Sequence, residues 1–267
     1  MNQTEILKKC FSFMDLTTLK TEDTPASVKK LVDKVTLLQK EYPSYPLPAS
    51  VCVYPNLANV VRENRPSEAL HVTAVSSCFP TAQSFLEVKV RECELAVENG
   101  ADEIDIVLAL NKFLAGDEDG ASEEIVAMKK AIDAAGAKAG RKIVLKVILE
   151  TGLLQTRELI YKASMLAMKA GADFIKTSTG KVAVNATPEA ARIMCEAIRD
   201  YYKESGRKVG FKAAGGISTA EDAMVYYNIG LEILGEQWLN KDFFRFGVSR
   251  VGNSLMSAIE GREIKFF

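Results

Sequence analysis

The feature that most constrains the fold of this chain is a strand–helix alternation that repeats about eight times. Short β-branched and aliphatic runs alternate with longer segments whose apolar residues recur at helical spacing. Such alternation indicates a parallel sheet with helices outside it, so we predict an α/β fold, a single TIM (β/α)8 barrel. The strands are expected at residues 50–54, 71–76, 102–108, 143–150, 173–177, 209–213, 231–234 and 244–248.

Residues 1–48 are expected to form an extra helical segment that caps the barrel, and residues 49–267 the barrel itself, within one domain. This segment contains a short helix at 1–9, a turn at 14–19, a helix at 24–41 that caps the lower end, and a Pro-rich connector. Three glycines are expected just past helices and before strands: Gly100, Gly171 and Gly230. A doubly wound open sheet is the alternative, but no G-x-G-x-x-G follows the first strand.

Composition and charge exclude several classes of function. Hydrophobic residues make up 48% of the 267 residues, enough for a large core, and the net charge of −1 gives no bulk field for nucleic acid or an anionic membrane. Without a long apolar run or a signal peptide, we expect a cytoplasmic protein. The five scattered cysteines favour buried free thiols over disulfides or a zinc site, and His71, the one histidine, is expected to be structural.

Four expected strands carry a charged residue where packing alone would place an aliphatic one: Asp105, Lys146, Lys176 and Lys212. A buried charge costs several kcal/mol unless it is paired. In a closed barrel, alternate residues of each strand point inward, so these four side chains can meet. Three lysines against one aspartate leave an unbalanced positive charge. A buried ion-pair network without chemistry is the alternative interpretation.

This imbalance favours amine chemistry. A lysine with the ordinary pKa of about 10.4 is almost fully protonated at neutral pH. A neighbouring ammonium and apolar walls both lower the pKa of a buried lysine, which frees part of the amine. A free amine can attack an aldehyde and form an imine, an electron sink that permits carbon–carbon cleavage without a metal.

Loops with unhindered backbone amides follow three late strands. Amides at the start of a helix cradle phosphate, and such loops lie together at the carboxyl end of a barrel. Each loop alone is also compatible with an ordinary turn, but together they favour a phosphate site. Their residues are Thr179, Gly180 and Lys181; Gly215 and Gly216; and Gly247 and Ser249.

Taken together, these segments resemble the deoxyribose-phosphate aldolases, metal-independent class I aldolases with a TIM barrel fold. The resemblance covers most of the chain and is strongest in the long segment GADFIKTSTGKVAVNATPE, which starts at Gly171. The other matching segments are MDLTTL from Met14, VCVYP from Val51, NGADEIDIV from Asn99, LKVILETG from Leu145, VGFKAAGG from Val209 and FRFGVS from Phe244.

The resemblance implies roles for individual residues. Lys176 becomes the Schiff-base lysine, Lys212 the ammonium beside it, and Asp105 the acid/base group that works through a water. Lys146 is implied to support this network. The resemblance also implies substrate-binding positions at Asp15, Thr17, Cys52, Thr179 and Lys181, and phosphate-binding positions at Gly215, Gly216, Gly247 and Ser249.

The implied reaction is the reversible cleavage of 2-deoxy-D-ribose 5-phosphate to acetaldehyde and D-glyceraldehyde 3-phosphate, in deoxyribose catabolism, without a cofactor or metal. The expected partner is a small sugar phosphate, not nucleic acid or a membrane, and we expect a homodimer or another homo-oligomer. Two alternatives stay open: a class I aldolase for another sugar phosphate, and a non-catalytic regulator that binds a sugar phosphate.

The chain departs from the family pattern in three places. The family motif KPAGG is KAAGG here, with Ala213 in place of the proline. Arg250 replaces a second serine after Ser249, which puts the phosphate contacts there in question, although an arginine can itself bind phosphate. The last residues, Ile264 to Phe267, lack the tyrosine that ends some members, so no tail-assisted proton transfer is expected.

Overall fold

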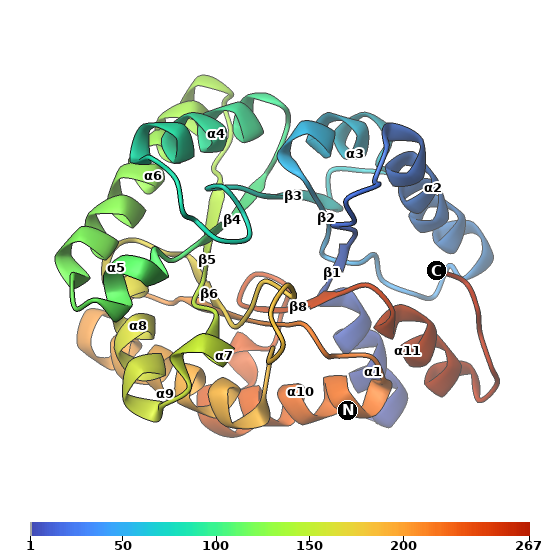
Figure 1. Cartoon of the computed structure of the whole chain (residues 1–267). Coiled ribbons are helices and arrows are strands. Elements are labelled where there is room, and N and C mark those ends of the chain that lie inside the picture. Colours follow the sequence, from blue (N-terminus) through green and yellow to red (C-terminus); the bar gives the residue numbers. More distant parts are fainter. Residues whose placement is uncertain (1) are drawn as a thin grey trace.

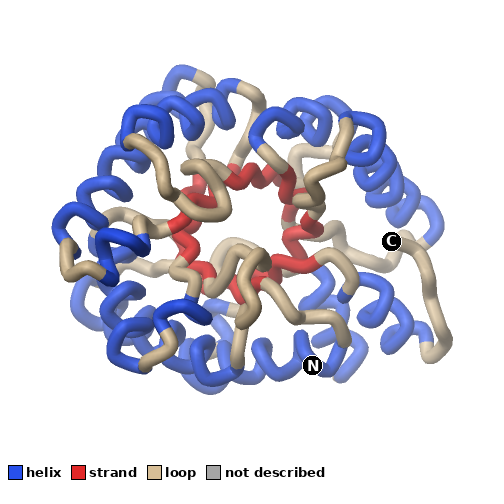
Figure 2. The backbone as a smooth tube through the Cα atoms, in the orientation of Figure 1, coloured by secondary structure: helices blue, strands red, loops and turns tan. Residues whose placement is uncertain are grey.

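The strands of the chain form one closed, fully parallel barrel in the order β1 to β8 (Figures 1 and 2). The computed structural model describes residues 2–267. Strand β1 pairs with both β2 and β8, which closes the barrel and confirms the predicted fold class. The strands are β1 Met14–Thr17, β2 Ser50–Val53, β3 His71–Val75, β4 Glu103–Val107, β5 Val144–Ile148, β6 Phe174–Lys176, β7 Gly210–Ala214 and β8 Phe244–Val248.

Helices surround the barrel on its outer side (Figure 2). No helix within residues 2–267 is both long enough and apolar enough to cross a membrane. The helices are α1 Gln3–Ser12, α2 Pro25–Glu41, η1 Pro55–Leu57, α3 Ala58–Asn64, α4 Leu86–Glu98, α5 Leu110–Leu114, α6 Glu118–Lys138, α7 Thr151–Leu154, α8 Arg157–Lys169, α9 Pro188–Ser205, α10 Ala220–Leu234, η2 Glu236–Trp238 and α11 Val251–Glu260.

Threonine caps fix where four of the helices begin. The side chains of the N-cap residues of α2, α8, α9 and α10 each accept a hydrogen bond from a backbone amide in the first turn, which satisfies a donor that the helix cannot. Helices α2, α9 and α10 follow loops that leave the carboxyl ends of strands, so their caps also fix the ends of those loops around the barrel mouth, while α8 follows the short helix α7. The caps are Thr24, Thr156, Thr187 and Thr219.

Two sequence-based assignments were wrong. The expected turn at 14–19 contains β1, because inward-facing polar residues such as Asp15 interrupt the apolar pattern that would mark a strand. The expected strand at 231–234 is the last turn of α10. Gly230 lies inside that helix, where a Cβ atom would stand 2.4 Å from the ring of Phe244, so this glycine permits close packing of helix on strand. Gly100 and Gly171 do end helices, each with φ of 107°.

These corrections change the role of the N-terminal segment. Because β1 lies within residues 1–48, the expected boundary between a cap and a barrel at residue 48 does not exist. Helix α2, expected under the barrel, connects β1 to β2 and packs beside α3 in the outer ring (Figure 1). The helix that precedes the first strand is α1, which packs against α10 and α11.

Each strand has one face toward the helices and one toward the barrel axis. In β4, Ile104 and Ile106 belong to the hydrophobic core that fills the space between strands and helices, while Glu103 and Asp105 alternate with them and are fully buried inside the barrel. The outer layer is therefore apolar, and the interior is charged. Buried charges are costly unless they are paired, so the way in which these groups pair determines which of them keep their charge.

Candidate active site

Two lysines lie side by side inside the barrel and share one partner. Lys176 and Lys212 are register partners at the carboxyl end of β6, in its pairing with β7. Both Nζ atoms donate to Oδ2 of Asp105, each at 2.8 Å. The two nitrogens are therefore no more than about 5.6 Å apart, twice that contact, a separation at which like charges shift each other's pKa. The sequence-based expectation that these two side chains meet is confirmed.

The other oxygen of Asp105 holds the third lysine. Lys146 Nζ donates to Asp105 Oδ1 at 2.8 Å and also lies 2.6 Å from Glu103 Oε2. Asp105 is thus a hub that contacts all three lysines and is fully buried. Carboxylate hydrogen bonds to ammonium groups are directional as well as strong, so this hub fixes the orientation of each lysine.

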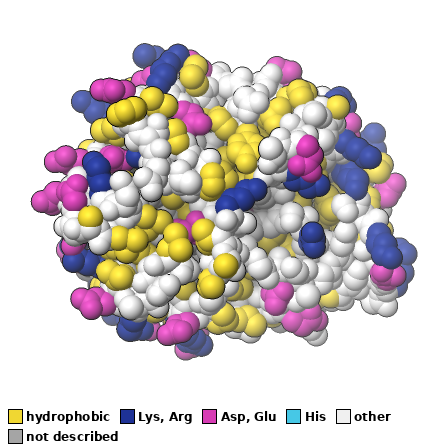
Figure 3. Space-filling view, in the orientation of Figure 1, with side chains coloured by type: hydrophobic (Ala, Val, Ile, Leu, Met, Phe, Trp, Pro, Cys, Tyr) yellow, Lys and Arg dark blue, Asp and Glu magenta, His cyan; other side chains and the backbone are white. Residues whose placement is uncertain are grey.

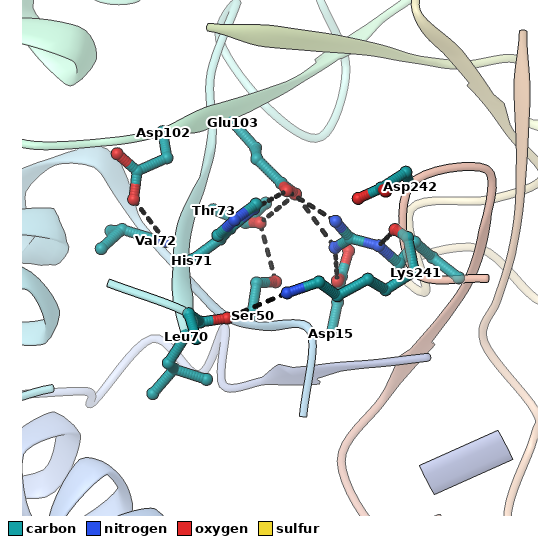
Figure 4. Close-up of polar contacts among 12 residues, drawn as sticks. Asp15, Ser50, Leu70, His71, Val72, Thr73, Asp102, Glu103, Lys241 and Asp242 are labelled. Atoms are coloured by element: carbon teal, nitrogen blue, oxygen red, sulfur yellow. Dashed lines mark hydrogen bonds and ion pairs between the residues drawn. The ribbon is translucent and has the colours of Figure 1, made fainter. Parts of the chain in front are cut away.

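A second layer of charge lies beneath the lysines. Arg245, from β8, donates from Nη2 to Glu103 Oε1 at 2.7 Å and from Nη1 to Asp15 Oδ1 at 2.5 Å. Asp15 in turn accepts from Lys212 through Oδ2 at 2.5 Å, which links the two layers. Glu103 also contacts the His71 ring at 2.7 Å (Figure 4). Asp15, implied to line the substrate cavity, is instead fully buried under Lys212.

The positive and negative charges inside the barrel are unequal in number at neutral pH if every group is ionised. Among the buried residues of the barrel interior in the described chain, four side chains are cationic and three are carboxylates, so the anticipated ratio of three lysines to one aspartate was wrong, although an excess of one positive charge remains. Loss of one proton from a lysine would remove that excess. The groups are Lys146, Lys176, Lys212 and Arg245 against Asp15, Glu103 and Asp105.

Lys176 is the lysine least held by carboxylates. Its Nζ contacts Asp105 alone, whereas Lys212 contacts two carboxylates and Lys146 lies within ion-pair distance of three. It is also the lysine that lines a cavity. The excess proton is therefore most easily lost from the amine that a ligand can reach.

Burial and neighbouring charges set the pKa of each central group. Burial lowers the pKa of Lys176 below the ordinary lysine value, and Lys212 lowers it further, although Asp105 acts in the opposite direction. Burial also acts to lower the pKa of Lys212, but Asp105 and Asp15 outweigh it and hold that pKa above its usual range. Burial would raise the pKa of Asp105, yet the three lysines hold it well below. The site combines a poised amine, a retained ammonium and an ionised carboxylate.

A cavity of about 320 Å³ opens above Lys176 at the carboxyl ends of the strands. It has the size of a small-molecule site and stands where barrel enzymes hold their ligands. Eight of the residues implied by the sequence line it: Thr17, Lys176, Thr179, Lys181, Gly215, Gly216, Gly247 and Ser249.

Glu150 organises one wall of this cavity and was missed from the sequence. Its carboxylate accepts from Thr179 Oγ1 at 2.5 Å and from the Thr179 backbone amide at 3.1 Å. Glu150 has a left-handed backbone, with φ of 53°, which non-glycine residues rarely adopt. Lys181 spans the cavity rim and donates to the carbonyl of Leu19 at 2.6 Å. The loop after β6 is thus held on both sides.

Asn185 is a second residue that the sequence did not single out. It lines the cavity, and its Oδ1 is buried without a hydrogen-bond partner among the described residues. Gly215 lies directly against Asn185: a Cβ atom on Gly215 would stand 2.7 Å from the Asn185 side chain. The φ of 80° at Gly215 also favours glycine. The glycine loop after β7 therefore has a close fit to the loop after β6.

The remaining sequence expectations fall outside the cavity. Cys52 is buried, and burial raises the pKa of its thiol. Ala213, which replaces the family proline, points into the hydrophobic core and not into the cavity. Arg250 lines a neighbouring cavity. The last residues are held away from the site, with Phe266 packed against Tyr42.

Comparisons with known proteins agree with this geometry. A family model described as DeoC/LacD family aldolase matches residues 10–240. The chain is 42% identical over 252 residues to a deoxyribose-phosphate aldolase of Agrobacterium fabrum, covering 94% of this chain and 91% of that one. It is 42% identical over 250 residues to a putative deoxyribose-phosphate aldolase of Caenorhabditis elegans, covering 93% and 79%. A structure of a putative deoxyribose-phosphate aldolase from Toxoplasma gondii shares the fold, with a TM-score of 0.80 at 22% identity and 97% and 98% coverage.

Proposed function

Because the chain belongs to the DeoC/LacD family of aldolases, we propose that it reversibly cleaves 2-deoxy-D-ribose 5-phosphate to acetaldehyde and D-glyceraldehyde 3-phosphate through an imine on Lys176. The observation that carries the proposal is the sharing of one Asp105 oxygen by Lys176 and Lys212. This contact supports the proposal because, among the described residues, Lys176 is the buried lysine that lines the cavity and Lys212 lies beside it. An aldolase of this class needs both.

In the proposed reaction, the Lys176 amine attacks C1 of the open-chain aldehyde and a water leaves as the imine forms. The protonated imine draws the electron pair of the C2–C3 bond, while the C3 hydroxyl gives its proton to Asp105 through a water. D-Glyceraldehyde 3-phosphate leaves. The remaining enamine takes a proton at C2, and water releases acetaldehyde from Lys176. Lys212 keeps its proton throughout and favours the neutral amine at the start of each cycle.

The loops around the cavity mouth are proposed to hold the rest of the substrate. The backbone amides near Gly215, Gly216 and Gly247 are unhindered, and Ser249 adds a hydroxyl, so this end suits the phosphate. Lys181 adds a positive charge. Thr17 and Thr179, which line the cavity, are proposed to border the sugar. Asp15 and Lys146 act by positioning, because both are fully buried within the ion-pair network.

The test is to trap the imine. Purified protein is treated with acetaldehyde and borohydride, digested, and analysed by mass spectrometry. We expect one reduced adduct on Lys176, no adduct and essentially no cleavage with Lys176→Ala, and unchanged behaviour with Lys169→Ala, which removes an exposed lysine of α8. Absence of any adduct in the active wild-type preparation would contradict the proposed chemistry and would favour a binding protein.

The substrate is tested separately from the chemistry. Cleavage of 2-deoxy-D-ribose 5-phosphate is compared with that of other sugar phosphates. We expect the deoxy sugar to give the highest kcat/KM, because it is the sugar phosphate whose cleavage leaves acetaldehyde on Lys176, as the proposed reaction requires. We also propose a cytoplasmic location, a role in deoxyribose catabolism, and a homodimer or another homo-oligomer. Light scattering at working concentration measures the last point.

A further inference from the structure

A second cavity, of about 360 Å³, lies beside the catalytic one, between the start of α2 and the start of α11. The two cavities share the wall formed by Thr17, Thr18, Lys20 and Ser249. The two cavities are therefore adjacent. We call the second cavity the basic pocket, because its lining includes Lys20, Lys30, Lys34 and Arg250.

The positive charge of the basic pocket is only partly balanced by protein groups. Within residues 2–267, none of its four cationic side chains has a carboxylate within ion-pair distance. Asp23 is the one carboxylate among the described residues of the lining, so four cations stand against one anion. Asp23 Oδ2 accepts from Thr18 Oγ1 at 2.7 Å and from the Lys20 backbone amide at 2.9 Å, which fixes the turn between β1 and α2.

Helix α2 shows that this imbalance is local. Lys29 and Asp33, spaced four residues apart, form an ion pair at 2.8 Å on one stripe of the helix. On the adjacent stripe, Lys30 and Lys34 have the same spacing and face the pocket with like charges. Like charges at this spacing destabilise a helix. Figure 3 shows Lys and Arg side chains gathered on the side of the molecule that α2 occupies in Figure 1. An anionic ligand would offset that cost.

We propose that the basic pocket binds a second phosphoryl group, so that the site takes small molecules carrying two or more phosphoryl groups. This rests on the proposed function in one respect: the first phosphoryl group occupies the glycine loops of the catalytic cavity. The second is then held by Lys30 and Lys34 on one wall and Arg250 on the other. Arginine and lysine are the side chains that suit phosphate oxygens, and a net charge of −1 for the whole chain provides no general attraction for anions.

The experiment compares inorganic phosphate, pyrophosphate and tripolyphosphate as ligands, by calorimetry, for three proteins. In wild type we expect tripolyphosphate to bind at least about tenfold more tightly than phosphate. The double variant Lys30→Gln/Lys34→Gln should lose at least about fivefold of that gain. The matched control Lys29→Gln/Lys40→Gln, which also removes two positive charges from α2 but outside the pocket, should retain that gain.

Two results would overturn the inference: equal affinity for phosphate and tripolyphosphate in wild type, or the same loss in Lys29→Gln/Lys40→Gln as in Lys30→Gln/Lys34→Gln. The second would show a general charge effect and no specific pocket. Binding is measured without turnover, so the inference and the proposed aldolase activity fail separately. A protein that cleaves the deoxy sugar yet shows no gain for tripolyphosphate refutes only the basic pocket.

Discussion

Arg245 and Glu103 form a buried ion pair beneath the lysines, with Arg245 Nη2 2.7 Å and Nη1 3.1 Å from the two carboxylate oxygens. Neither residue lines the catalytic cavity. Their importance lies in the charge they add to a closed interior, where an arginine stays charged at every accessible pH. We therefore expect the pair to influence the protonation of Lys176 without touching a substrate.

Changing the two partners should move the pH profile in opposite directions. Arg245→Met removes a cation, so Lys176 keeps its proton more readily and the profile of kcat/KM shifts to higher pH, by about one unit. Glu103→Gln removes an anion and shifts the profile to lower pH. The profile is measured with the cleavage assay between pH 6 and pH 10, a range below the ordinary lysine pKa of about 10.4, because the pKa of Lys176 is lowered.

Arg245→Lys is the control for that pair of variants, because it keeps the charge and loses the bidentate geometry. Its pH profile should stay close to that of wild type even if its stability falls. The pair would act through packing and not through charge if the pH profiles of Arg245→Met and Glu103→Gln shifted in the same direction. The same conclusion would follow if the profile of Arg245→Lys shifted as far as that of Arg245→Met.

Asp105→Asn should destabilise the fold by about 3–5 kcal/mol at pH 7, because it leaves three buried lysines without their common carboxylate. The pKa of Asp105 in the folded state lies well below the ordinary 3.8, so its stabilising effect is complete above that value and is lost as the pH falls through the lowered one. Denaturant titrations from pH 7 toward pH 2 should show that the difference in the free energy of unfolding between variant and wild type becomes smaller in acid. A difference that is independent of pH would contradict this.

Gly215→Ala and Gly216→Ala form a matched pair in the loop after β7. The two glycines have φ of 80° and 82°, so alanine is strained at both positions, by about 1–2 kcal/mol. Only at Gly215 would the added Cβ also meet Asn185, at 2.7 Å, while Gly216 faces open space. We expect Gly215→Ala to lose more stability in urea denaturation and to raise KM more. Equal losses would show that the contact with Asn185 does not matter.

The sequence predicted the barrel and the lysine cluster because both leave periodic signals. Lys146, Lys176 and Lys212 interrupt strands that are otherwise aliphatic. The strand β1 was missed because its inward-facing polar residues hide a short apolar pattern, and the end of α10 was misread because Gly230 was taken as a helix stop. In each case, tertiary packing overrode the local signal.

Glu103 and Arg245 could have been found from the sequence, but the charge balance could not. Glu103 stands two residues before Asp105 in one strand, so the two share a face, and Arg245 interrupts an aromatic strand in the same way as the lysines. Their pairing depends on which strands lie across the barrel. The role of Glu150 depends on a left-handed backbone that no residue pattern predicts.

The central claim is that Lys176 loses its proton more readily than an ordinary lysine because it is buried beside Lys212. The direct measurement is the rate of borohydride-trapped adduct formation on Lys176 with acetaldehyde, as a function of pH, in wild type and in Lys212→Met. The account predicts a half-maximal rate below the ordinary lysine value of 10.5 in wild type and at a higher pH in the variant. A wild-type midpoint at or above 10.5, or a midpoint that does not move in Lys212→Met, would contradict it.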